Sequence, residues 1–137
     1  MSGIQIVFGS AVFGSRPHSK VRDAASAQPF LDALEKHGIT TIDTAQLYQG
    51  SEEILGQASA GDRFIIDTKD PGGFMPDRAP TSDAIRKDLE DSLAKLKVKQ
   101  VDVFYIHAPI EESKSELASW LPGVDALHKQ GKRSELP

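Results

Sequence analysis

The chain has 137 residues, a length typical of one domain, and it is 39% hydrophobic and 26% charged, as is usual for globular proteins. Its 16 basic and 20 acidic residues give a net charge of −4, and no basic stripe indicates a nucleic-acid or membrane-surface partner. The absence of cysteine excludes disulfides and thiolate metal sites, and we find neither a ~20-residue apolar span nor a signal peptide, so we expect one cytoplasmic domain over residues 1–137.

The first part of the chain indicates two strands separated by a helix. Residues 4–8 and residues 39–43 form short apolar runs. Between them, apolar side chains around Leu31 recur at helical spacing. We expect this helix to begin near Pro29 and to end before Gly38.

The middle of the chain predicts a short helix, a strand and a loop. Ser51 is a candidate N-cap, and Glu52 and Glu53 follow it in the first turn, where the helix dipole favours anions. Residues 64–69 predict a third strand, and residues 70–80 predict a loop rich in proline and glycine.

The clearest helix begins at Thr81 or Ser82 and carries an apolar stripe of four residues: Ile85, Leu89, Leu93 and Leu96. Residues 101–107 predict a fourth strand, which we expect to be buried on both faces because four of its residues in a row are apolar or aromatic. Residues 117–127 predict a last helix. Strands and helices that alternate in this way predict an α/β fold with a parallel sheet.

Four titratable residues lie at or just beyond strand ends. Asp43 follows the second strand, Lys69 and His107 close the third and fourth, and Tyr48 lies five positions after Asp43. In β/α barrels the carboxyl ends of successive strands build the reaction centre. We therefore expect these four side chains to converge on a site that handles protons.

The four residue types suit carbonyl chemistry. A tyrosine with a pKa near ~10 is a weak acid, and a nearby ammonium such as that of Lys69 lowers this pKa. Such a phenol can donate a proton to a developing alkoxide, while a neutral His107 hydrogen-bonds the same oxygen. Taken one at a time, each residue also has a structural interpretation: Asp43 as a turn cap, Tyr48 as a loop aromatic, Lys69 in a surface ion pair and His107 as a satisfied strand-end histidine.

The walls of a substrate pocket are expected from four apolar residues: Leu47, Phe74, Met75 and Trp120. No cluster of histidines and carboxylates has the spacing of metal ligands, so we expect no metal site.

Five segments carry a resemblance to a known family. They are residues 41–48 (TIDTAQLY), 51–56 (SEEILG), 67–69 (DTK), 101–109 (VDVFYIHAP) and 127–132 (LHKQGK). At these residues the chain resembles the aldo-keto reductases, in particular the branch of the aflatoxin-aldehyde reductases. The resemblance implies a TIM-type (β/α)8 barrel, NADPH as cofactor and a catalytic tetrad of Asp43, Tyr48, Lys69 and His107. It also implies that Tyr48 is the general acid and that Asp43 contributes to cofactor binding.

The resemblance covers only the N-terminal half of the family's barrel, because residues 133–137 (RSELP) replace the expected fifth strand. We therefore expect the half that the family uses to bind NADPH to be absent, which makes NADPH binding by this chain doubtful. We expect four strands and four helices that form a half barrel, and four strands cannot close a barrel of eight. Exposed strand edges favour association, so we expect a homo-oligomer or a complementary half-barrel chain to complete it.

Three functions follow from this resemblance. The first is an aldo-keto reductase-like oxidoreductase that acts on a small-molecule carbonyl compound, with Tyr48 as general acid. The second is a cofactor-independent acid–base enzyme, an isomerase, dehydratase or cyclase, that reuses the tetrad. The third is a binding remnant without catalytic activity.

Overall fold

The computed structural model describes residues 4–75 and 81–108, and within them strands and helices alternate as predicted. The strands β1 (Val7–Gly9), β2 (Thr41–Asp43), β3 (Ile65–Asp70) and β4 (Phe104–Ile106) form a parallel sheet in the order β1-β2-β3-β4. The helices are α1 (Ala24–Lys36), α2 (Ser51–Gln57) and α3 (Ser82–Leu96), with 3-10 turns η1 (Ala60–Asp62) and η2 (Gly72–Phe74) before and after β3. The architecture is a partial α/β barrel. The predicted last helix and Trp120 lie outside the described residues.

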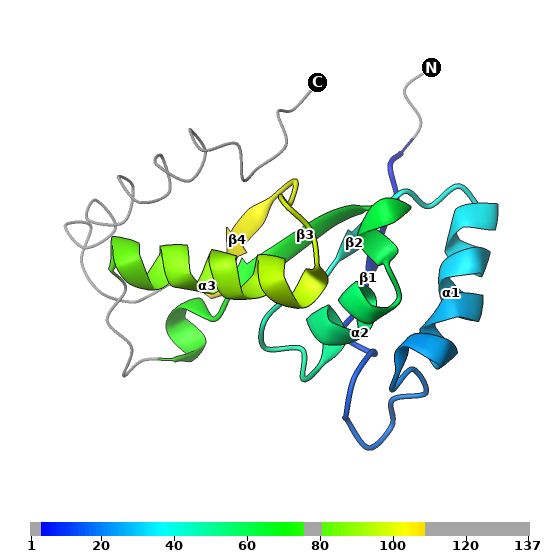
Figure 1. Cartoon of the computed structure of the whole chain (residues 1–137), viewed down its shortest axis with the longest axis horizontal. Coiled ribbons are helices and arrows are strands. Elements are labelled where there is room, and N and C mark those ends of the chain that lie inside the picture. Colours follow the sequence, from blue (N-terminus) through cyan, green and yellow to red (C-terminus); the bar gives the residue numbers. More distant parts are fainter. Residues whose placement is uncertain (1–3, 76–80, 109–137) are drawn as a thin grey trace.

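The helices lie together against one face of the sheet. Figure 1 shows α2 and α3 side by side in front of the strands, with α1 next to α2. A single apolar cluster joins the three helices to this face, with Leu31 and Leu55 packed near Ile42 and Ile66 of the central strands. The predicted stripe of α3 is confirmed, since all four of its residues are buried.

The beginning of α3 is confirmed and that of α1 is corrected. The Thr81 side chain accepts a hydrogen bond from the backbone N–H of Ala84, as an N-cap does. The helix α1 begins five residues before Pro29, because Asp23 and Ser26 form a reciprocal capping box. Pro29 therefore lies inside the helix, where its missing N–H leaves one carbonyl of the preceding turn without its usual donor.

The prediction that Ser51 caps α2 is wrong. Gly50 is the N-cap, with a positive φ of 92° that favours glycine, and no side chain caps this helix. The Ser51 hydroxyl is instead buried, 2.9 Å from the Ser10 hydroxyl, and it accepts a hydrogen bond from Thr44. These bonds tie the start of α2 to the carboxyl ends of β1 and β2.

The opposite face of the sheet is partly open, although Thr41 and Asp67 on it are buried. Val7 of β1, Ile65 of β3 and Tyr105 of β4 are 45%, 47% and 44% exposed. Burial of the fourth strand on both faces was therefore a wrong prediction, since its central residue Tyr105 is not buried. Alternation along a strand assigns Asp67 and Lys69 to the face of Ile65. Lys69, and Asp43 by its register with Asp67, thus lie on the face that the helices leave uncovered.

Candidate active site

Asp43 and Lys69 meet at the carboxyl ends of β2 and β3. The Lys69 ammonium forms an ion pair with the Asp43 carboxylate and donates a hydrogen bond of 2.8 Å to the carbonyl of Thr44. Both side chains are largely shielded, at 15% and 25% exposure. Shielding strengthens the attraction between the charges and limits screening by salt. The amine is therefore held at a defined position at the mouth of the sheet.

Tyr48 and His107 lie beside this ion pair. Their rings meet edge to face, with centroids 5.6 Å apart. The Lys69 nitrogen is 5.6 Å from the centroid of the Tyr48 ring. The structure thus brings together all four residues that the strand-end pattern singled out, and the loop after β2 supplies Tyr48 as expected.

The electrostatics of Tyr48 differ from the sequence-based expectation. Burial raises the pKa of the Tyr48 phenol, the negative charge of Asp43 raises this pKa further, and Arg16 partly offsets both effects. The expected lowering by Lys69 is therefore wrong. The physical reason is that Lys69 is paired with Asp43, whose charge opposes its effect at the phenol. Tyr48 is consequently protonated at neutral pH.

His107 is set up as a neutral imidazole. Burial lowers its pKa below the ordinary value of 6.5, and the positive charge of Lys69 lowers it further, against a smaller effect of Asp43. Its Nδ1 atom is buried and makes no hydrogen bond to any residue that the structure describes. A neutral imidazole has one donor and one acceptor nitrogen, so His107 can donate one hydrogen bond to a bound molecule.

The turn after β3 contributes one of the expected pocket residues. The Phe74 ring packs edge to face on His107, with centroids 5.2 Å apart, although Phe74 is 61% exposed. Gly73 donates a hydrogen bond to the carbonyl of Ala108, and a Cβ on Gly72 would lie 2.6 Å from the same oxygen. The turn η2 is thus docked against the end of β4 rather than free. Of the other expected wall residues, Leu47 is half-buried and Met75 is 44% exposed.

Sequence reasoning missed two neighbours of the site. Tyr105 pairs in register with Lys69, whose nitrogen lies 5.4 Å from the centroid of its ring. Arg16 lies in the loop after β1, where Ser15 donates a backbone hydrogen bond to Gln49 beside Tyr48. The apolar run of β4 does not indicate that Tyr105 faces the open side of the sheet. Nothing in the local sequence indicates that the β1 loop meets the Tyr48 loop.

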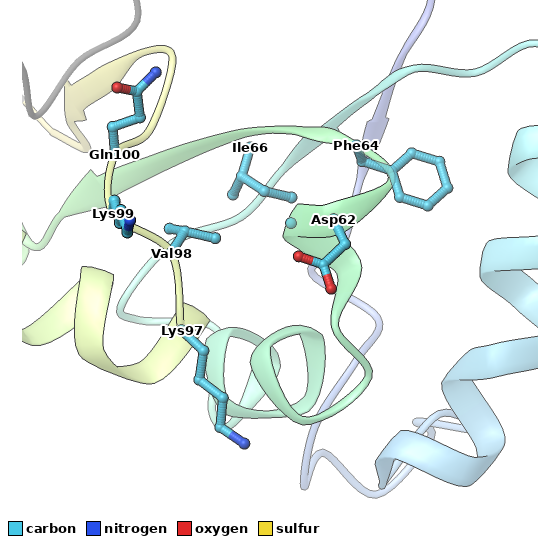
Figure 2. Close-up of a pocket in the computed structure, with 8 residues that line it drawn as sticks. Asp62, Phe64, Ile66, Lys97, Val98, Lys99 and Gln100 are labelled. Atoms are coloured by element: carbon cyan, nitrogen blue, oxygen red, sulfur yellow. The ribbon is translucent and has the colours of Figure 1, made fainter.

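A hollow of about 360 Å³ lies at the other end of β3, lined by η1 residues, Phe64, Ile66 and residues 97–100. Figure 2 shows that Gln100 and Lys97 point away from each other there rather than towards a common point. This hollow therefore lacks converging polar groups.

Other kinds of site find no support in residues 4–75 and 81–108. No group of three or more histidine, aspartate or glutamate side chains in this part could hold a metal ion. In the same residues no helix has the length and apolar character needed to cross a membrane. Phosphate groups need cations or free backbone N–H groups. Near Tyr48 the described residues offer Arg16, in the loop after β1, whereas the Lys69 charge is paired with Asp43. This part of the chain therefore does not by itself fit a complete dinucleotide.

Comparison with known proteins links these residues to one family. The model of the Aldo/keto reductase family matches residues 5–135. The chain is 33% identical over 133 residues to the oxidoreductase sirO of Leptosphaeria maculans, covering 92% of this chain and 39% of that protein. It is 34% identical over 134 residues to the human aflatoxin B1 aldehyde reductase member 4, covering 93% of this chain and 39% of that protein. The chain thus spans about two fifths of the length of these curated relatives.

A solved structure supports the same fold. An aldo-keto reductase from Bacillus halodurans in its holo form superposes with a TM-score of 0.72 at 24% identity, covering 94% of this chain and 43% of that chain. The four-stranded sheet and its helices therefore correspond to part of an α/β barrel.

Proposed function

The chain belongs to the aldo/keto reductase family, and from this membership we propose that it reduces a carbonyl compound with Tyr48 as the general acid. The observation that carries the proposal is the convergence of Tyr48, His107 and the Lys69–Asp43 ion pair at the carboxyl ends of three parallel strands. Carboxyl ends of parallel strands are where β/α barrels carry their chemistry.

The raised pKa of Tyr48 keeps the phenol protonated, as a general acid must be. At neutral pH the phenol holds its proton, so it can donate that proton when the carbonyl oxygen gains negative charge. His107, kept neutral by burial and by Lys69, donates a hydrogen bond to the same oxygen and orients the carbonyl group. The ion pair of Lys69 and Asp43 holds a fixed amine beside the Tyr48 ring, and Arg16 is the cation that favours the phenolate that remains. The product is the corresponding alcohol.

The family implies NADPH as the cofactor, which supplies a hydride when bound. The described residues provide the acid side of such a reaction but not a full set of phosphate ligands, so the cofactor needs further protein surface. We infer that this surface comes from additional barrel units, contributed by a second copy of the chain or by a complementary half barrel. In the part of the chain that the structure describes, β1 and β4 are the outer strands of the sheet, and Val7, Ile65 and Tyr105 are exposed; both observations support such an assembly. Sedimentation tests it, and an active monomer would contradict it.

Replacement of the two tyrosines tests the chemistry. Tyr48→Phe removes the proton donor, and we expect the rate of reduction of an aromatic aldehyde by NADPH to fall about 100-fold or more. Tyr105→Phe is the matched control, because Tyr105 also lies beside Lys69 and the same hydroxyl is removed. Its rate should stay within about threefold of the unmodified protein. Equal activity of the Tyr48→Phe variant and the unmodified protein would refute the proposed acid.

A titration with NADPH separates the reductase from the cofactor-independent alternative. For the reductase we expect saturable binding by fluorescence, with reduction that depends on Tyr48. If saturating NADPH gave no signal but the chain still converted a carbonyl substrate in a Tyr48-dependent manner, the acid–base isomerase, dehydratase or cyclase would replace it. If neither binding nor turnover were found, the binding remnant would be favoured.

A further inference from the structure

A buried carboxyl group lies directly behind the candidate active site, on the helix side of the sheet. Glu52, in the first turn of α2, is 1% exposed. Its Oε1 atom accepts a hydrogen bond of 2.6 Å from the Thr68 hydroxyl. Its Oε2 atom makes no hydrogen bond of good geometry to a described residue, although Ser92 of α3 interacts with the carboxyl and lowers its pKa; the atom lies 4.0 Å from the nitrogen of Lys95, which is closer to Glu53. Glutamate is rarely buried to this extent without a specific partner.

The partner of Glu52 sits next to a proposed catalytic residue. Thr68 directly precedes Lys69 on β3, and the two side chains point to opposite faces of the sheet. Lys69 therefore faces the site while Thr68 faces the helices and is fully buried. A hydrogen bond that fixes Thr68 also fixes the backbone from which Lys69 projects.

Glu52 itself is close in sequence to the other proposed acid–base residue. The backbone N–H of Ser51 donates a hydrogen bond of 2.6 Å to the carbonyl of Tyr48, so the Tyr48 turn leads straight into α2. The bond between Glu52 and Thr68 thus connects the segment that carries Tyr48 to the strand that carries Lys69.

A second buried connection acts on the same strand position. The backbone N–H of Gln46 donates to the carbonyl of Lys69 at 3.2 Å. The Gln46 side chain in turn donates to the Ser92 hydroxyl and to the carbonyl of Asp88 on α3. Lys69 is therefore held through its own carbonyl by α3 and through Thr68 by α2. The connection through Glu52 involves a buried carboxyl group, which makes it the more sensitive of the two to substitution.

We propose that Glu52 and Thr68 are positioning residues, which set the place of Lys69 relative to Tyr48 and His107 through their buried hydrogen bond. The proposal rests on the proposed function for its kinetic consequence. Its geometric consequence, the distance of the Lys69 charge from His107, is independent of turnover.

The pKa of His107 in the full chain reports this distance, because the Lys69 charge lowers it. We would follow the His107 resonance by NMR over pH, assigned by its loss in His107→Gln. Lys69→Met removes the ammonium charge completely, so it gives the reference for the largest rise in the His107 pKa. Thr68→Val, which keeps the shape but removes the hydroxyl, should give a clear part of that rise. Thr68→Ser, which keeps the hydroxyl, should give none.

Substitutions of Glu52 supply a second route in case Thr68→Val fails to fold. Glu52→Met removes the buried carboxyl group, and with it the acceptor, and puts an apolar side chain of similar length in its place, a kind of replacement that is often tolerated. It should raise the His107 pKa as Thr68→Val does. Glu52→Gln keeps a carbonyl acceptor for the Thr68 hydroxyl, so the pKa of His107 should stay at its value in the unmodified protein. In the active assembly, Thr68→Val should lower kcat about tenfold with little change in KM, the effect of one buried hydrogen bond.

An unchanged His107 pKa in folded Thr68→Val or Glu52→Met would overturn the proposal, whether or not the protein turns over a substrate. A shifted pKa with a protein that reduces no carbonyl would instead leave the positioning intact and refute the proposed function. Equal losses of kcat in Thr68→Val and Thr68→Ser would also overturn it, because the hydroxyl would then have no special role.

Discussion

Gly56→Ala tests how closely α2 is docked against α3. A Cβ on Gly56 would lie 2.0 Å from the carbonyl oxygen of Lys95 and 2.9 Å from the carbonyl carbon of Leu96, whereas ordinary contact begins at 3.4 Å. The obstacle is backbone, so it cannot rotate away, and the two helices must separate by about 1 Å or more. A gap of this size removes about a quarter to a half of the dispersion energy of each contact it opens.

The sign of the change in the free energy of unfolding decides this prediction. Glycine to alanine inside a helix normally stabilises by about 1 kcal/mol. Overpacking against an immobile backbone costs about 3 kcal/mol at the upper end of its usual range, so we expect a net loss of about 2 kcal/mol. For a domain of this size the loss corresponds to a decrease in Tm of about 8 °C.

Thermal unfolding followed by circular dichroism measures this change. Gly9→Ala is the matched control, because a Cβ on Gly9 would meet no atom within 4 Å, and its stability should change by less than about 0.5 kcal/mol. If Gly56→Ala proved as stable as the unmodified protein, or more stable, the close approach of α2 to α3 would be refuted. The placement of Glu52 and Tyr48 would then lose its support as well, since both depend on the position of α2.

Two further predictions concern titrating groups. Burial raises the pKa of Glu52 above its ordinary value of 4.5, so the folded state holds a proton that the unfolded state releases, and stability should fall as pH rises from 4.5 through the raised pKa. Glu52→Gln should abolish this fall, which urea unfolding at several pH values would show; parallel pH profiles of the two proteins would contradict it. Arg16→Gln should raise the pKa of Tyr48 further, because Arg16 lowers it. Phenolate absorbance measures this in a Tyr105→Phe background, which leaves Tyr48 as the single tyrosine, and an unchanged titration would argue against the coupling.

Features that depend on local sequence could be predicted. The helix α3 follows from Thr81 as cap and from apolar residues three and four apart, and both are as expected. The strand ends that bring Asp43, Lys69 and His107 together follow from short apolar runs that stop at a titratable residue. The sequence also contains a signal for the start of α1, because Asp23 and Ser26 have the spacing of a capping box. Pro29, which favours the first turn of a helix, indicates a later start and is misleading here.

Features that depend on distant partners could not be predicted. Ser51 has a good residue type for an N-cap, but Ser10, 41 positions earlier, and Thr44 take up its hydroxyl. Tyr105 lies within an apolar run, yet it is on the sheet face that the helices do not cover. The pKa of Tyr48 depends on the sum of its burial and the charges of Asp43 and Arg16, and the sign of that sum requires their positions.

The two faces of the sheet contribute different features to the candidate site. On the open face, Lys69 and Asp43 carry charge where a substrate can approach. On the covered face, the adjacent residue Thr68 is bound by the buried Glu52. Buried polar groups cost stability unless they are hydrogen-bonded, so a folded chain that places them directly behind the strand ends must keep those ends in one arrangement to satisfy them. On the proposed function, the geometry of the proton donor would thus be enforced from the covered side of the sheet.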